Sequence, residues 1–133
     1  MSVLSKQNIL QVKDSVIERV SVPEWGGEVC LRSITAAERG FIEAAAATYK
    51  ESKGKDASFA RTFTVKILSM ALCDEEGKRL FSDDEVSQLA QKNAKVVARL
   101  AEVAQRLSGF AKEDLDELEK NLPRAQAEDL PSA

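Results

Sequence analysis

The 133-residue sequence contains no histidine, only two cysteines, and only 5% aromatic residues. The absence of histidine removes the commonest general base and the commonest metal ligand. Cys30 and Cys73 are far apart in the sequence and form no CxxC motif, so we expect two reduced thiols that behave as small apolar side chains. No apolar run approaches the roughly 20 residues that span a bilayer, and no signal peptide precedes the first polar residues. We therefore expect a cytoplasmic protein with no membrane partner.

The sequence also lacks a large excess of charge of one sign, because 19 basic residues nearly balance 22 acidic residues and the net charge is −3. No part of the sequence is rich in lysine and arginine. A protein that binds nucleic acid usually carries such a basic surface. We therefore expect no nucleic-acid partner.

Sequence motifs for catalysis are absent as well. There is no GxGxxG, no P-loop, no GxSxG, and no histidine that could pair with a serine or cysteine. The acidic residues between Asp74 and Glu85 do not follow the alternating oxygen ligands of a calcium-binding loop. The other paired carboxylates fall at helix starts, where capping explains them. The sequence therefore predicts no catalytic residue, no metal site and no cofactor.

The stretch from Val20 to Arg39 indicates a strand, a tight turn, a second strand and a capped helix start. Residues 17–22 alternate as a strand that Pro23 ends, and two glycines in the turn 24–27 supply positive φ angles. The return strand is expected at about 28–34. A two-stranded hairpin is marginal in water. One of its faces should therefore pack on helices, or its edges should pair with another chain.

The rest of the chain follows a helical pattern. Thr35 and Glu38 form a capping box, and the helix to residue 52 has an expected apolar stripe of Phe41, Ile42, Ala45, Thr48 and Tyr49. A helix at 57–73 is the most apolar and is expected at the centre. Leu80 and Phe81 should return to the core before a second capping box, Ser82 with Glu85, opens a helix at 83–91. Further helices are expected at 94–108 and 112–121, and a short one at 6–12 without a capping box, because Asn8 is not Glu or Gln.

These elements predict a mainly α fold with a small β-hairpin near the N-terminus, a single-domain helical bundle of the α+β class. The domain should span residues 15–122, between a polar lead at 1–14 and a disordered tail at 123–133. Trp25 at the hairpin tip is either a buried plug or an exposed contact, and burial is the favoured reading. The grooves between amphipathic helices are the other candidate surface. As partner-binding residues the sequence suggests Trp25, Phe41, Tyr49, Phe59 and Phe63.

The order of several motifs carries a resemblance to a known family. The run VPEWGGEV at 22–29, then Leu31-Arg32 and Thr35-Ala36-Ala37-Glu38-Arg39, resembles the opening block of the tail assembly chaperones of long-tailed, siphovirus-type bacteriophages. In that family a VPEWGG turn precedes an LR-x-LT-x-x-ER helix start. Further matches are LCD at 72–74, LF at 80–81, RLSG at 106–109 and EKN at 119–121. The resemblance covers about residues 4–121.

Two residues depart from this family pattern. Ile34 stands where leucine is expected, and Gly40 lies within the first long helix. A glycine there costs about 1 kcal/mol relative to alanine. It suggests that another backbone passes close to Gly40.

The resemblance implies a non-enzymatic function in the cytoplasm of the host cell. Such chaperones bind the tape measure protein, keep its apolar helices soluble, help recruit tail tube subunits, and leave before the virion is complete. A longer frameshifted form often contacts the tail tube protein. The alternative is a structural minor tail or connector protein that stays in the virion. The sequence leaves self-association open.

Overall fold

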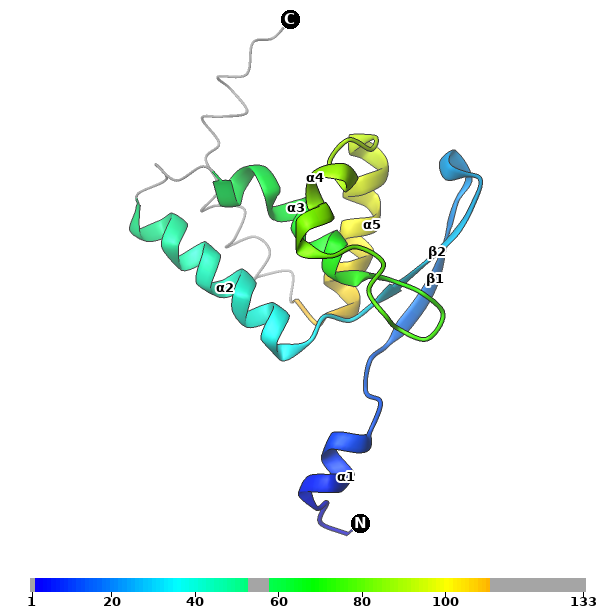
Figure 1. Cartoon of the computed structure of the whole chain (residues 1–133), viewed down its shortest axis with the longest axis vertical. Coiled ribbons are helices and arrows are strands. Elements are labelled where there is room, and N and C mark those ends of the chain that lie inside the picture. The colour runs from blue at the N-terminus through cyan, green and yellow to red at the C-terminus, as the bar shows by residue number, and fades with distance from the viewer. Residues whose placement is uncertain (1, 53–57, 111–133) are drawn as a thin grey trace, which may run out of the picture.

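The computed structural model describes residues 2–52 and 58–110. At residues 58–61 it describes the backbone but not the side chains. Its elements follow the chain in the order shown in Figure 1. The helices are α1 (Lys6–Gln11), α2 (Ala36–Glu51), α3 (Ser58–Ala71), α4 (Val86–Leu89) and α5 (Ala94–Leu107). The strands are β1 (Ile17–Val22), β2 (Gly27–Arg32) and β3 (Leu72–Cys73), and two 3-10 turns are η1 (Pro23–Trp25) and η2 (Asp83–Glu85).

The sheet is antiparallel with the strand order β1-β2-β3. β1 pairs along its whole length with β2, from Ile17 opposite Arg32 to Val22 opposite Gly27. The turn between them uses Gly26 at φ +79°, a conformation that costs glycine little. This confirms the expected hairpin, but Gly27, the other glycine expected at positive φ, lies in β2 and does not have a positive φ. The return strand was expected at about 28–34, whereas β2 begins at residue 27 and already ends at Arg32.

β3 was not predicted from the sequence. Its two residues continue directly from α3 and pair with the middle of β2, so that Cys73 lies opposite Cys30. Both cysteines are free thiols. Burial raises the pKa of the Cys73 thiol, which favours its neutral form.

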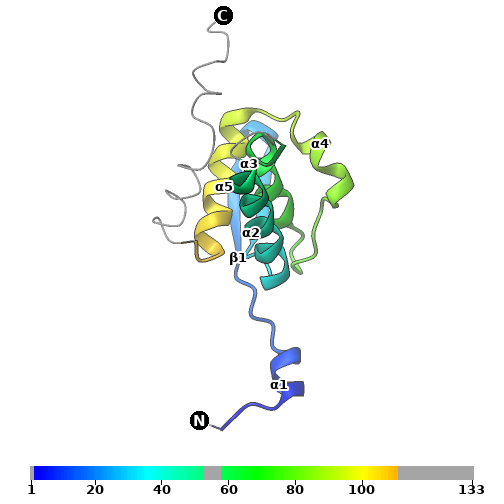
Figure 2. The same cartoon turned by 90° about the vertical axis from the view of Figure 1, so that its left-hand side faces the viewer.

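The core surrounds α3, as the sequence predicted. α3 contacts α2, α4 and α5, and α5 also packs against the hairpin. Figure 2 shows α5 and α4 on opposite sides of this helical layer. The buried apolar side chains include Val22, Leu31, Ile42, Ile67, Leu68, Leu72, Leu89, Val97 and Leu100. The helices therefore cover one face of the hairpin, which a free two-stranded ribbon would leave exposed.

Several sequence-based expectations at helix boundaries and surfaces are wrong. The expected helix at 83–91 is divided into the 3-10 turn η2 and the single turn α4. Ser5 does form a capping box, because the Asn8 side chain accepts from the Ser5 backbone N–H at 3.1 Å. The side-chain oxygen of asparagine therefore accepts the hydrogen bond that Glu or Gln usually accepts at this position.

The expected apolar stripe of α2 is narrower than predicted. Ile42 and Tyr49 are buried, whereas Phe41 and Thr48 are exposed. Leu80 does not return to the core and is also exposed. Its neighbour Phe81 is partly buried and packs against the core. The helix has one face toward α3, so residues one position away from Ile42 and Tyr49 turn toward solvent.

Some predictions fall outside the described residues. These are the helix expected at 112–121, the tail from residue 123 and the side chain of Phe59. The limits of the expected domain at 15–122 stay a prediction.

Gly40 provides a test of helix propensity on α2. An added Cβ would meet no heavy atom within 4 Å, so the close backbone expected from the sequence is not found among the residues that the structure describes. We expect Gly40→Ala to raise the free energy of unfolding by about 1 kcal/mol. Urea unfolding followed by circular dichroism would measure the change. An unchanged or lower midpoint would show that the glycine meets a need outside the folded monomer.

Candidate partner-binding surface

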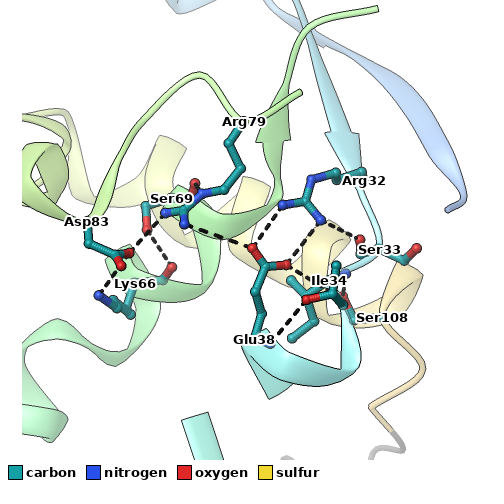
Figure 3. A network of polar contacts seen from close by, with 10 residues as sticks. Arg32, Ser33, Ile34, Glu38, Lys66, Ser69, Arg79, Asp83 and Ser108 are labelled. Atoms are coloured by element: carbon teal, nitrogen blue, oxygen red, sulfur yellow. Dashed lines mark hydrogen bonds and ion pairs between the residues drawn. The ribbon is translucent and has the colours of Figure 1, made fainter. Parts of the chain in front are cut away.

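A buried ion pair joins the end of the hairpin to the start of α2. Arg32 at the end of β2 donates from both terminal nitrogens to the Glu38 carboxylate, at 3.0 and 2.9 Å. The two side chains are only 7% and 15% exposed. A bidentate pair of this kind fixes orientation as well as distance. The ion pair therefore fixes the orientation of α2 relative to the end of β2 (Figure 3).

Glu38 also completes the helix cap. Its carboxylate accepts from the Thr35 backbone N–H at 2.9 Å, and the Thr35 hydroxyl accepts from the Glu38 N–H at 3.1 Å. The sequence predicted this capping box. It did not predict that Arg32 shares the same carboxylate, because the pairing requires the strand to end beside the first helical turn. The only sequence signal for this pair was that Arg32 lies near the end of the expected strand, six residues before Glu38.

The network extends from Glu38 across the molecule to α3 and η2. Arg79 lies 3.9 Å from the Glu38 carboxylate and donates to the Asp83 carboxylate at 3.2 Å. Lys66 of α3 reaches the same Asp83 oxygen at 3.3 Å. Figure 3 shows these side chains as one chain of contacts. The loop after β3 is therefore held to both α2 and α3.

The pKa of Glu38 reflects two opposing causes. Burial raises it, but the hydrogen bonds from Arg32 and Thr35 outweigh burial, so the pKa is lowered overall. A lowered pKa in the folded state stabilises the fold above the unfolded-state pKa of about 4.3. This contribution is lost as the pH falls through the folded-state pKa.

Two further ion pairs hold the hairpin along α5. Arg106 donates to Glu18 at 2.7 Å near the base of the hairpin. At its tip, Arg99 makes a bidentate contact with Glu24 at 2.8 and 3.0 Å. The hydrogen bonds from Arg99 and the backbone lower the pKa of Glu24 to about 2. The hairpin tip is therefore attached to the body although it is exposed.

The five suggested partner-binding residues do not lie together. Tyr49 and Phe63 are buried in the core, and Trp25 is half-buried against it. Phe41 is 54% exposed. The side chain of Phe59 lies outside the described residues. Partner binding by these residues stays a prediction, and Phe41 has the accessibility that a contact residue needs.

An exposed apolar surface forms around Phe41. The Lys66 ammonium lies 4.8 Å from the centre of the Phe41 ring, and the same ammonium pairs with Asp83. We call Phe41, Lys66 and Asp83 the Phe41 surface. It combines apolar area with one charge of each sign, as many protein-binding surfaces do.

The N-terminal segment is a second exposed apolar region, which the sequence did not single out. Residues 2–16 extend away from the body, and α1 buries none of its residues (Figures 1 and 2). Most of the exposed large apolar side chains of the described residues lie on or beside it, namely Val3, Leu4, Ile9, Leu10, Val12, Val16 and Ile17. We call residues 2–16 the N-terminal arm.

Among the described residues, no three His, Cys, Asp or Glu side chains are placed to hold a metal ion. Within the same residues, no helix has the length and apolar character to cross a membrane.

The ion pair of Arg32 and Glu38 provides a pH-dependent test. We expect Glu38→Gln to lower the free energy of unfolding at pH 7 by about 3 kcal/mol, because it leaves a buried arginine charge unpaired. The difference from the wild type should shrink as the pH falls from the unfolded-state pKa of about 4.3 through the lower folded-state pKa of Glu38, because wild-type Glu38 then becomes protonated too. Urea unfolding across this pH range would measure both effects.

Glu43→Gln is the matched control for this experiment. Glu43 pairs with Arg39 at 3.0 Å on an exposed face of α2, and such pairs contribute about 0.5 kcal/mol or less. A gap between Glu38→Gln and the wild type that stays constant with pH would contradict the assigned ionisation.

Comparisons with known proteins agree with this architecture. The family model described as phage tail assembly chaperone matches residues 5–121. The fold is similar to the solved structure of the bacteriophage HK97 tail assembly chaperone, with a TM-score of 0.56 and 23% sequence identity. The matched region covers 76% of this chain and 94% of the HK97 chain. This likeness shows a shared fold. A search of curated proteins found no match. Because the family model spans most of the sequence, this chain belongs to the phage tail assembly chaperone family.

Proposed function

We propose that this chain binds the tape measure protein, keeps its apolar helical segments soluble, and helps recruit tail tube subunits. Its family assists phage tail assembly and implies contacts with tail proteins and a non-enzymatic role. The particular client is our inference. It acts in the cytoplasm of the host cell and is left out of the finished virion.

The observation that supports client binding is the Phe41 surface. An aromatic ring that is 54% exposed on a capped, well-anchored helix is unusual in a chain with so few aromatics. Folding alone does not account for it, because Ile42 and Tyr49 already attach α2 to the core. An apolar ring beside a lysine suits an amphipathic helix, which presents apolar and acidic residues together.

The net charge of the chain supports a holding function. The chain is acidic overall, and a net negative charge keeps a complex soluble while apolar surface is covered. The chaperone would thus lower the concentration of free, aggregation-prone client. Recruitment of the tube protein would use a second surface or a longer frameshifted form of this chain.

The Phe41 surface can be tested by co-expression with the tape measure protein of the same phage. We expect the wild type to raise the soluble fraction of that protein, and Phe41→Ser to reduce this effect severalfold. The Phe41 side chain is more than half exposed, so the variant should unfold at nearly the wild-type temperature. Soluble and pelleted fractions on gels, with pull-down, provide the measurement.

Leu4→Ser is the matched control, because Leu4 is also apolar and 59% exposed but lies on the N-terminal arm. It should leave client solubility unchanged. If the wild type neither co-purifies with the tape measure protein nor keeps it soluble, the proposed client is wrong. Detection of the chain in purified virions by mass spectrometry would favour the structural tail protein instead.

A further inference from the structure

The two cysteines lie directly opposite each other where β3 joins the sheet. Cys30 of β2 pairs with Cys73 of β3 in an antiparallel ladder, and the side chains of directly opposed residues lie on the same face of a sheet. Burial raises the pKa of the Cys73 thiol, and the nearby Cys30 raises it further. Two thiols that are far apart in the sequence are therefore neighbours in the fold.

The backbone hydrogen bonds show which kind of pair the cysteines form. Cys73 also forms a bridge with Arg79, on the side of β3 away from β2. On that side the Leu72 carbonyl accepts from the Leu80 N–H at 3.0 Å, so the bonds there are made by the neighbours of Cys73. The N–H and C=O of Cys73 itself therefore point toward β2, and Cys30 and Cys73 form a hydrogen-bonded pair.

The spacing of such a pair permits a disulfide bond but strains it. Its Cα atoms lie about 5.5 Å apart, inside the range of about 4.4–6.8 Å that disulfides span. Its Cβ atoms lie at the wide end of the cross-strand range, about 5.5 Å, whereas a disulfide draws them to about 3.8 Å. The bond therefore requires the two strands to approach each other, and a strained disulfide is readily reduced.

The surroundings of the two thiols set the order in which they react. Cys30 is partly exposed, whereas Cys73 is buried, so a reagent meets Cys30 first. Arg32 lies two residues after Cys30 and therefore on the same face of β2. Among the described residues its Nε–H is a buried donor without a hydrogen-bond partner. Burial raises the pKa of Cys73, but the positive charge of Arg32 opposes this effect and favours the thiolate that completes a disulfide.

We infer that Cys30 and Cys73 form a reversible disulfide within the chain by exchange with a low-molecular-weight disulfide. The Cys30 thiolate attacks one sulfur of the reagent, whose S–S bond breaks and releases one thiolate, and a mixed disulfide remains on Cys30. The Cys73 thiolate then attacks the Cys30 sulfur and displaces the second half of the reagent. Two protein thiols are oxidised, one reagent disulfide is reduced to two thiols, and the two protons pass to those thiols.

The bond would join the hairpin to the end of α3. It would close a loop of the chain that contains both α2 and α3. The inference goes beyond the proposed client function and does not depend on it, because neither cysteine belongs to the Phe41 surface.

Treatment of the folded wild type with oxidised glutathione tests this site. The remaining thiols are alkylated with N-ethylmaleimide, and mass spectrometry of the intact chain should show the loss of two hydrogens and no alkylated thiol. Digestion should yield the peptides of Cys30 and Cys73 joined to each other. An excess of reduced glutathione should return both thiols, because a strained disulfide does not resist it.

Two variants and a denatured sample serve as controls. Cys73→Ala should stop at a mixed disulfide on Cys30, whereas Cys30→Ser should stay unmodified over the same time because Cys73 is buried. In urea the register is lost. The ratio of internal disulfide to doubly glutathionylated chain should therefore be lower in urea by about tenfold or more. This comparison uses the wild type, so it decides the outcome even if a variant does not fold.

Three results would overturn the inference. One is a folded wild type in which no internal disulfide forms, and another is an internal disulfide that forms as well in urea as in the folded chain. The third is an internal disulfide that an excess of reduced glutathione does not open. None of these readouts involves the tape measure protein, so failure of the client proposal and failure of this one can be told apart.

Discussion

The contact between Arg32 and Glu38 is the constraint on which the rest of the structure depends. One carboxylate caps α2, pairs with the end of β2 and lies near Arg79 of the following loop. Because all three segments meet at Glu38, the hairpin, the helical layer and the loop after β3 are fixed relative to one another. The apolar core then packs beneath this junction. Burial of an ion pair adds little net stability in general, but it sets the direction in which α2 leaves the sheet.

This arrangement separates two kinds of exposed surface. The Phe41 surface lies on α2 and the loop that the ion-pair network holds. The N-terminal arm leads into the hairpin, which Arg99 and Arg106 attach to α5. A chaperone with separate surfaces can hold a client and associate with another protein at once.

Most of the fold could be predicted because its elements depend on local patterns. The capping boxes at Thr35 and Ser82, the glycine turn after Trp25 and the apolar repeat of α3 and α5 each involve residues within one or two helical turns. Two errors are local, namely the missed Ser5 capping box and the division of the expected 83–91 helix, and the others concern contacts between distant residues. β3 is two residues long and exists only because β2 passes beside it. Leu80 and Phe41 are exposed because the neighbouring positions already fill the contact with the core.

The candidate surfaces divide in the same way. The sequence by itself determined the hairpin, the capped helices, the empty set of catalytic motifs and the aromatic residues from which Phe41 could be chosen. Only the tertiary structure decided that Tyr49 and Phe63 are core residues while Phe41 is exposed, and that the N-terminal arm is exposed. The physical reason is that hydrogen bonds and side-chain spacing along one element are local, whereas burial depends on which other elements pack against it.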